Sequence, residues 1–419
     1  MNKVYLCIDL KSFYASCECS DRGLDSMNTN LVVADPTRGK GTICLAVSPS
    51  LKALGVKNRC RVYEIPEGID YIMAKPRMKR YMEVSSLIYS IYLKYVSQED
   101  IHVYSIDECF LDVSDYLSLY EMDEMELAKM IIKDIYDETG IVASCGIGTN
   151  LFLTKVALDI TAKHSPDHIG YLDEIKFKEE LWDHKPLKDF WNISDGISNR
   201  LLKYGVDTLR KVTEMDEDIL YKEFGINAEL LIDHAYGIET TTIADIKAYK
   251  SKSRSLTQGQ VLFEDYNFKN GLIILKEMVD LIVYDLVEKQ LVATGISLCV
   301  KYSKDTYKMS GGSRRIDVHT AQLSKLLDYF TTLYNETTSK TLPIRGVSIS
   351  VSVTSEYNEI ISIFDDPDDV NKDRDLTKTI IDIKNKYGAN SVLKAMNYQE
   401  KATTKERNKF IGGHNSGEN

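Results

Sequence analysis

The sequence predicts a mixed α+β protein built from several domains. Its 419 residues exceed what one compact core usually holds. Strand and helix signals alternate over residues 1–164, helical signals dominate residues 165–242, and a β-α-β-β-α-β order follows over 255–354. With 43% hydrophobic and 27% charged residues, the composition is that of an ordinary soluble globular protein.

The first region is expected to fold around one sheet. Apolar spacing predicts strands at 4–8 and 141–147, a hairpin at 102–113, and helices at 80–95, 124–138 and 150–160. This order fits a ferredoxin-like arrangement. Residues 22–75 interrupt it and are interpreted as an inserted, smaller subdomain.

Carboxylates stand where apolar strands of this region end. Asp9 closes the run V-Y-L-C-I-D, and the pair Asp107 and Glu108 interrupts H-V-Y-S-I-D-E-C-F-L-D-V. A half-buried carboxylate is costly unless it is paired or holds a metal. Three such acids, if they converge, would suit two Mg²⁺ ions that clamp the attacking and leaving oxygens of a phosphoryl transfer.

The later regions lack acids at their strand ends. The polar run A-Y-K-S-K-S-R-S at 248–255 is interpreted as a linker. After it we expect strands at 255–263, 294–302, 306–315 and 345–354, and helices at 268–288 and 320–335. This repeats the order of the first region, so the two could share a topology. Beyond Phe364 we expect a helix at 376–386 and a loosely ordered stretch at 399–419.

Charge and cysteine content limit the protein class. The net charge of −11 at first argues against a polyanionic partner, yet residues 243–355 hold 15 Lys and Arg against 11 Asp and Glu. Net charge affects nonspecific attraction rather than the existence of a specific groove. The eight cysteines include no C-x-x-C pair, which favours reduced thiols in a cytoplasmic protein. No membrane partner is expected, because no apolar run approaches the length of a span.

Two motifs together resemble a known family. I-D-L-K-S-F-Y-A-S-C-E at 8–18, followed by Y-S-I-D-E at 104–108, is similar to the Y-family translesion DNA polymerases. F-Y-A-S-C-E and K-A-L-G-V (52–56) resemble the UmuC-like branch. R-N-K-F-I-G-G-H-N-S near the C-terminus resembles the UvrX-type proteins of Gram-positive bacteria and their phages.

The resemblance covers roughly residues 3–355 and implies a right-hand polymerase. Its implied parts are a ferredoxin-like palm (1–21 and 76–164), small fingers (22–75), a helical thumb with a helix-hairpin-helix (165–242), a β-α-β-β-α-β little finger (243–355) and a C-terminal tail (356–419). The implied activity is template-directed, low-fidelity DNA synthesis in DNA damage tolerance, as part of the SOS response.

The resemblance also implies roles for active-site residues. Asp9, Asp107 and Glu108 match the metal ligands for two Mg²⁺ ions, and the backbone carbonyl of Leu10 matches a further ligand. Phe13 and Tyr14 match nucleotide-binding positions, with Tyr14 as the steric gate below the sugar that excludes a 2′-hydroxyl. Lys52 and Lys155 match triphosphate-binding positions. Pro49 stands where many relatives have a tyrosine, so that hydrogen bond to the triphosphate is absent or replaced.

Contacts with DNA and with other proteins are implied as well. Gly196, Ile197 and Ser198 resemble a helix-hairpin-helix, in which Gly196 would allow a tight turn and backbone amides would meet a phosphate. Basic residues expected along primer-template DNA are Arg254, Lys301, Lys304, Lys308, Arg314 and Arg315. Residues 359–364 fall where relatives place a sliding-clamp peptide, with Ile360 in place of the usual glutamine. Accessory SOS proteins are further possible partners, beside the dNTP substrate.

Two other interpretations remain open. Nucleotidyl cyclases share a similar palm and paired metal-binding acids, but they leave the helix-hairpin-helix and the basic module at 243–355 unexplained. A phage or plasmid regulator could retain the fold as a DNA- or clamp-binding module with weak catalysis. The intact acids argue against that regulator, whereas Pro49 keeps it open.

Overall fold

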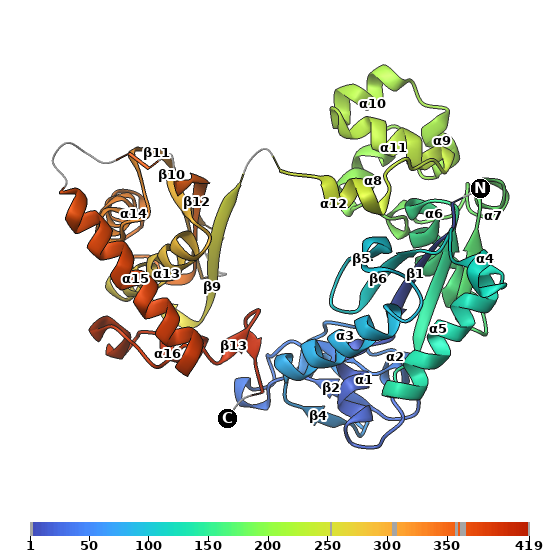
Figure 1. The fold of residues 1–419 in the computed structure, drawn as a ribbon, viewed down its shortest axis with the longest axis horizontal. Coiled ribbons are helices and arrows are strands. Elements are labelled where there is room, and N and C mark those ends of the chain that lie inside the picture. Colours follow the sequence, from blue (N-terminus) through green and yellow to red (C-terminus); the bar gives the residue numbers. More distant parts are fainter. Residues whose placement is uncertain (1–2, 252–253, 304–307, 357–358, 361–365, 418–419) are drawn as a thin grey trace. The chain divides into compact units, whose positions relative to one another are not determined.

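The computed structural model describes residues 3–251, 254–303, 308–356, 359–360 and 366–417 (Figure 1). It divides into two compact units: unit 1 is Met1–Tyr249 with Asn415–Asn419, and unit 2 is Lys250–His414. The division falls after α12 (Ile243–Ala248) rather than before it. Thr242 caps this helix and Ile243 is buried in a core cluster of unit 1, so the helix closes the first unit instead of opening the second.

A central sheet organises unit 1. Its strands lie in the order β5-β6-β1-β7-β8, with bounds β1 Tyr5–Leu10, β5 Ile101–Val103, β6 Glu108–Asp112, β7 Ala143–Gly148 and β8 Ile169–Leu172. β1 is antiparallel to β6 and β7, while β7 and β8 are parallel. The first strand is therefore central, as in a ferredoxin-like sheet, and the ferredoxin-like arrangement expected for this region is confirmed.

Helices flank this sheet, with the bounds α1 Phe13–Ser20, α3 Met78–Tyr92, α4 Leu117–Tyr120, α5 Glu124–Thr139 and α6 Leu151–Val156. The apolar spacing predicts α3, α5 and α6 but not α1 or α4. α5 begins with a capping box between Asp123 and Glu126 and ends at Gly140, whose φ is 67°. α6 is shorter than expected because it passes into a π-helical turn at Ala157–Thr161.

The residues inserted after α1 form a small subdomain, as expected. Its sheet has the order β3-β2-β4, with β2 Leu31–Val33, β3 Ala46–Val47 and β4 Ile72–Ala74. The helix α2 (Pro49–Ala53) packs on this sheet through Leu51. A separate apolar cluster that includes Val32, Val47 and Leu51 gives the subdomain its own core.

The expected helical region completes unit 1. Its helices are α7 Glu174–Glu180, α8 Asp195–Leu202, α9 Leu209–Thr213, α10 Glu217–Phe224, α11 Asn227–Tyr236 and α12. α7 to α11 share a core formed around Leu201, Leu209 and Leu220, which also receives Phe152 and Val156 from α6. The palm and the helical region are thus joined through one apolar cluster.

Unit 2 repeats the order of elements but not the order of strands. Its strands are β9 Ser255–Tyr266, β10 Leu291–Tyr302, β11 Met309–Thr320 and β12 Ile344–Ser355, and its two long helices are α13 Phe268–Glu288 and α14 Leu323–Thr337. The sheet order is β11-β10-β12-β9, so the first strand lies at an edge here and at the centre in unit 1. The idea that both regions share one topology is therefore wrong.

The C-terminal stretch is more ordered than the sequence suggests. It contains α15 Pro367–Tyr387, α16 Thr404–Arg407, β13 Phe410–Ile411 and β14 His414–Asn415. Glu277 of α13, only 1% exposed, accepts hydrogen bonds from the amides of Thr403 and Thr404 and from the side chain of Asn397. Buried polar anchors, which composition does not reveal, hold this stretch. Within the described ranges, no helix has the length and apolar character needed to cross a membrane.

Candidate active site

Strand register brings the three predicted acids together. Asp9 on β1 lies directly opposite Glu108 on β6, and the amide of Leu10 donates a 2.9 Å hydrogen bond to the carbonyl of Asp107. β1 is the central strand and β6 its neighbour, so acids far apart in sequence meet at one end of the sheet. The expectation that residue 9 lies beside residues 107 and 108 is confirmed.

The acids repel one another in a desolvated setting. Burial, followed by the charges of Asp107 and Glu108, raises the pKa of Asp9 to about 7. Glu108 turns toward Lys155 and also accepts a 3.2 Å hydrogen bond from the Cys7 thiol, while Ser105 donates to Asp107. Among the described residues, no three His, Cys, Asp or Glu side chains converge as a ready-made metal cluster. The donors are adjacent, but their side chains face different partners.

The chemistry of this donor set fits a hard divalent cation. Carboxylate oxygens and the backbone carbonyl of Leu10 are the oxygen ligands that such ions prefer. The repulsion that raises the pKa of Asp9 is also what a bound cation would relieve. The residues present therefore suit a metal site, although the side-chain directions seen here are not those of a closed coordination shell.

Lys155 holds Glu108 rather than facing a nucleotide. Its ammonium lies 2.8 Å from Glu108 and 3.0 Å from Asp159, and it does not line the cavity beside Asp9. Burial would lower the pKa of Lys155, but the charges of Asp159 and Glu108 outweigh it and keep that pKa above its ordinary value. The geometry does not favour the predicted triphosphate contact for Lys155.

Two glycines let α6 lie directly on the sheet and so bring Lys155 to Glu108. A Cβ on Gly146 would lie 2.1 Å from the carbonyl oxygen of Thr154, and a Cβ on Gly148 would lie 2.5 Å from the amide nitrogen of Thr154. Both positions are on β7, and no side chain fits between this strand and the helix. Because α6 lies so close to β7, Lys155 on this helix reaches past β7 and β1 to Glu108 on β6.

A cavity of about 420 Å³ opens beside Asp9 and Asp107. This volume lies within the range of small-molecule sites. Its lining joins the palm to the inserted subdomain and comprises Asp9, Leu10, Ser12, Phe13, Tyr14, Leu45, Ala46, Lys52, Asn58, Arg59, Ser105, Ile106 and Asp107. The structure therefore gathers Asp9, Asp107, Leu10, Phe13, Tyr14 and Lys52 around one space, while Glu108 and Lys155 lie outside its lining.

The turn into α1 directs Tyr14 to this cavity. Ser12, just before the helix, has φ 48° and ψ 44°, a left-handed conformation that is uncommon for a residue with a side chain. The hydroxyl of Ser16 donates to the carbonyl of Lys11 at 2.6 Å and closes the turn. Burial and the nearby charge of Asp107 raise the pKa of Tyr14, which agrees with its position on the cavity wall.

Lys11 and Lys52 lie close enough to Asp9 to feel its charge, and Lys163 lies close to Lys52. Lys52 lies in the last turn of α2, which Pro49 opens at a helical position where proline is well accommodated. Desolvation lowers the pKa of Lys52, and the charge of Lys163 lowers it further. Desolvation and the charge of Lys52 likewise lower the pKa of Lys11, whose ammonium lies 2.9 Å from Nδ1 of His168. Such mutually repelling cations suit a polyanionic ligand.

Lys11, Lys163, Asn58 and Arg59 were not singled out from the sequence. Lys11 stands inside the motif at 8–18, which is a usable signal, since its neighbours Asp9 and Tyr14 were both recognised. Lys163 carries no such signal, because it follows the π-helical turn at Ala157–Thr161, where helical spacing no longer predicts direction.

The thumb prediction requires a correction. Gly196 lies in the first turn of α8 and has no left-handed φ, so it does not form the tight turn. Turns with positive φ occur instead at Asn192 (66°) and Gly205 (76°), on either side of the helix. Gly196, Ile197 and Ser198 remain at a helix start, where amides point along the axis toward a possible phosphate.

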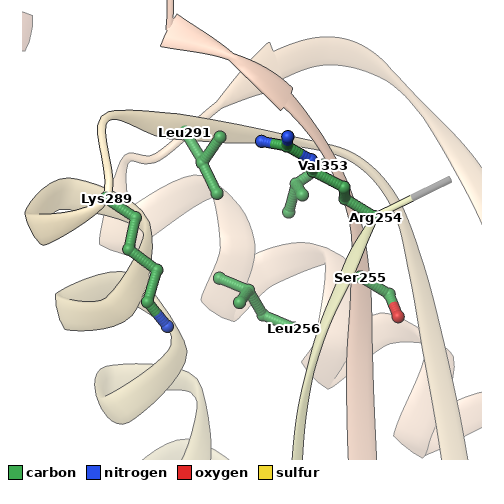
Figure 2. A pocket seen from close by; sticks show the side chains of 6 residues that line it. All are labelled: Arg254, Ser255, Leu256, Lys289, Leu291 and Val353. Atoms are coloured by element: carbon green, nitrogen blue, oxygen red, sulfur yellow. The ribbon is translucent and has the colours of Figure 1, made fainter. Parts of the chain in front are cut away.

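The basic residues of unit 2 do not form a single face. Neighbouring strand positions point to opposite faces, and Arg314 pairs with Glu336 of α14 while Arg315 lies at the next position. Lys301 and Lys308 are exposed, and Lys304 lies outside the described residues. Arg254 lines a different feature, an open hollow of about 550 Å³ with Lys289 at its other side and Leu256, Leu291 and Val353 within it (Figure 2).

Small hydroxyl side chains lie on the face of the unit 2 sheet away from α14. Across neighbouring strands, Thr257 donates to Ser350 at 2.9 Å, and Ser297 and Ser313 share a hydrogen bond of 2.8 Å. The period-two pattern of serines in β12 is the sequence signal that could have revealed this face.

The segment predicted to bind a sliding clamp is described only at its start. Glu359 pairs with Arg374 of α15, and the amide of Ile360 donates to the carbonyl of His319 at 2.9 Å. The side chain of Ile360 is 44% exposed. Residues 361–364 of the predicted peptide lie outside the described residues.

Comparisons with known proteins agree with this arrangement. The impB/mucB/samB family model matches residues 8–159, which contain all three acids. The chain is 32% identical over 422 residues to the "Putative UV-damage repair protein UvrX" of Bacillus subtilis (strain 168), covering 99% of this chain and 98% of that protein. It is 27% identical over 426 residues to "DNA polymerase IV 2" of the same organism, covering 98% of each chain.

A solved structure shows the same fold. The "Y-family DNA polymerase chimera" of Dbh and Dpo4 matches with a TM-score of 0.65 and 19% identity, over 86% of this chain and 100% of that one. This agreement confirms the expected mixed α+β multidomain fold. The similarity to UvrX over nearly the full length of both chains, with the family match, establishes that this chain belongs to the impB/mucB/samB family, the Y-family DNA polymerases that its motifs resemble.

Proposed function

We propose that this chain is a template-directed DNA polymerase of the translesion type, which adds dNTPs to a primer 3′-hydroxyl with low fidelity in DNA damage tolerance. The observation that carries the proposal is that Asp9, Asp107 and Glu108 are adjacent to one another. They lie beside a cavity whose lining also includes Tyr14 and Lys52. Relatives that align with nearly the whole chain are named DNA polymerase IV, which supports the same activity.

Asp9, Asp107, Glu108 and the carbonyl of Leu10 would hold two Mg²⁺ ions, which when bound supply charge stabilisation for phosphoryl transfer. The chain's own contribution is to concentrate these oxygens at one strand end. Lys155 holds the Glu108 carboxylate in place through an ion pair of 2.8 Å.

Lys11, Lys52 and Lys163 would bind the triphosphate of the incoming nucleotide. Asp9 and Lys52 affect the pKa of Lys11, and Asp9 and Lys163 affect the pKa of Lys52, so neighbouring members of this group lie within electrostatic reach. Phe13 and Tyr14 would lie below the sugar, with Tyr14 excluding a 2′-hydroxyl. Arg59, which also lines the cavity, offers a further cationic contact.

Primer-template DNA would be held without sequence readout. Amides at the start of α8, around Gly196–Ser198, would meet backbone phosphates, and the hydroxyl-rich face of the unit 2 sheet would follow the duplex with Lys301 and Arg315. We also propose a sliding clamp as partner through 359–364, and accessory SOS proteins as partners in the cytoplasm. Deleting 359–364 should then reduce processivity only when the clamp is present.

Primer extension by the purified chain tests the proposal. With Mg²⁺ and dNTPs, we expect extension on an undamaged template and past an abasic site. Asp107→Ala and Glu108→Ala should abolish extension while DNA binding persists. Asp115→Ala is the matched control, because this exposed acid follows the same strand outside the cavity and should leave extension intact. Extension that survives in either acid variant would refute the metal assignment.

A further inference from the structure

The residues Asn415–Gly417, here called the C-terminal clasp, pack against the start of α3 within unit 1. The amide of Lys79 donates a 3.0 Å hydrogen bond to the carbonyl of Ser416, which is only 6% exposed. The amide of Gly417 donates to the side chain of Asn415 at 2.9 Å and shapes the segment. Because no side chain caps α3, the Ser416 carbonyl supplies an acceptor for its first turn.

Gly417 lies against the side-chain stem of Arg77. A Cβ at this glycine would be 2.9 Å from Cβ of Arg77, closer than real Cβ contacts come, and 3.1 Å from its Cα, tighter than most of them. Gly417 also has φ 92°, a conformation that other residues rarely adopt. The clasp thus presses backbone directly on Arg77 and admits no side chain at this point.

Arg77 in turn holds a buried carboxylate. Its Nε lies 2.8 Å from Oε1 of Glu18, which is 0% exposed, and its Nη2 lies 2.6 Å from Asp21. Arg22 pairs with the other oxygen of Glu18. A buried carboxylate keeps its place only while such charge-assisted partners remain, so the position of Arg77 bears on that of Glu18.

Glu18 connects this network to the cavity. The hydroxyl of Tyr81 donates to Glu18 at 2.8 Å, and Tyr81 is fully buried. The ring of Tyr14 stacks on that of Tyr81, with 4.6 Å between centroids and 17° between planes. Tyr14 then lines the cavity beside Asp107. A continuous path of contacts therefore leads from Gly417 through Arg77, Glu18 and Tyr81 to Tyr14.

We propose that the C-terminal clasp positions Tyr14 and so sharpens the rejection of ribonucleotides. By holding Arg77 on Glu18, the clasp fixes the Tyr81 ring on which Tyr14 rests. A steric gate depends on the ring's exact height below the sugar, so a small displacement makes room for a 2′-hydroxyl. The inference rests on the proposed polymerase function and on Tyr14 as its gate. It also gives a role to the motif R-N-K-F-I-G-G-H-N-S near the C-terminus, which takes no part in the proposed chemistry of the cavity.

The test uses full-length variants in single-nucleotide primer extension. Gly417→Val should dislodge the clasp, because the new side chain meets Arg77 at a strained φ. Gly388→Val is the matched control: its φ is 95°, but a Cβ there meets nothing within 4 Å. Tyr14→Ala is the benchmark for a lost gate. Tryptophan fluorescence verifies folding of unit 1, since both tryptophans, Trp182 and Trp191, belong to it.

Gly417→Val should raise the ratio of rNTP to dNTP incorporation efficiency by about fivefold, the scale of coupling through packed networks. The change should appear as a lower KM for rNTP with kcat for dNTP largely kept, and Gly388→Val should change neither. Arg77→Ala should raise the ratio too, and adding Gly417→Val to it should have no further effect, because both act on one contact. Hydrogen exchange at the start of α3 should become faster in Gly417→Val.

The contrary outcomes separate this inference from the proposed function. A ratio unchanged by Gly417→Val while Tyr14→Ala raises it overturns the inference alone. So does an equal rise in Gly388→Val, or unchanged hydrogen exchange at α3. Failure of Tyr14→Ala to relax sugar selection removes the gate and the inference with it. Failure of the wild-type chain to extend any primer overturns the proposed function and, with it, this inference.

Discussion

The ammonium of Lys155 lies 2.8 Å from Oε1 of Glu108, and both side chains are about 90% removed from solvent. Asp159, 3.0 Å from the same ammonium, makes the lysine a bridge between a residue of the acid cluster and the π-helical turn. Lys155 is therefore placed to hold carboxylates of the protein rather than to bind a nucleotide. Variants of Lys155 can distinguish these two roles.

Lys155→Met should destabilise unit 1 by about 3 kcal/mol, because it leaves two carboxylates without their buried partner. Urea unfolding followed by tryptophan fluorescence measures this, as both tryptophans lie in unit 1. Lys133→Met is the control, since Lys133 pairs with Asp137 on the exposed side of α5 and should change nothing measurable. Equal stability of Lys155→Met and wild type would show that the bridge does not form in solution.

Lys163→Ala should weaken nucleotide binding. Lys155→Met should instead reduce turnover, because Lys155 holds the carboxylate of Glu108. Removal of one cation from the group of Lys11, Lys52 and Lys163 should raise KM for dNTP by about tenfold with little change in kcat, as expected for a lost charge-assisted phosphate contact. Steady-state single-nucleotide insertion separates the two constants. If Lys155→Met raised KM and Lys163→Ala did not, the sequence-based assignment of Lys155 would be the better one.

The arrangement of strands and acids follows from the sequence because the relevant signals are local. Asp9 stands at the end of one apolar run and Asp107 between two others, and the order of elements places the strand that follows Asp107 beside β1 in a ferredoxin-like sheet. The strand and acid predictions needed only period, strand end and element order. The role of Tyr14 instead rests on the resemblance to the Y-family polymerases, and the structure places it as the second residue of α1.

The features that the sequence did not reveal depend on helix phase or on distant contacts. The direction of Lys163 is set by a π-helical turn, which changes the rotation per residue without a clear composition signal. Gly196 is helical, whereas Asn192 and Gly205 form the turns. The sequence does not distinguish these cases, because glycine and asparagine occur both in turns and in helices. The C-terminal stretch is held by Glu277, which lies in the middle of α13. From the sequence alone, a glutamate there is expected to be solvent-exposed, because its hydrogen-bond partners are distant in the chain.

The thumb should become less stable in acid through Glu239. Burial would raise the pKa of this carboxyl, but hydrogen bonds from His234 and Thr241 lower it to about 2, below its ordinary value of 4.5. A lowered pKa contributes stability that is complete above pH 4.5 and is lost as the pH falls toward 2. His234 stacks on Trp191, so tryptophan fluorescence follows this site. In Glu239→Gln the loss of stability across that window should be smaller; an unchanged slope would contradict the assignment.

The C-terminal stretch should detach from unit 2 when Glu277 is removed. Glu277→Ala would leave the amides of Thr403 and Thr404 and the side chain of Asn397 without their acceptor at a buried position, at a cost of about 3 kcal/mol. Limited proteolysis should then cut within 394–409, and hydrogen exchange there should rise, while the sheet of unit 2 stays protected. Glu264→Ala serves as the control, because Glu264 also binds this stretch, through Lys401, but its side chain is 58% exposed and water can replace it. Equal protection of 394–409 in both variants would mean that apolar packing, rather than the buried carboxylate, holds the stretch in place.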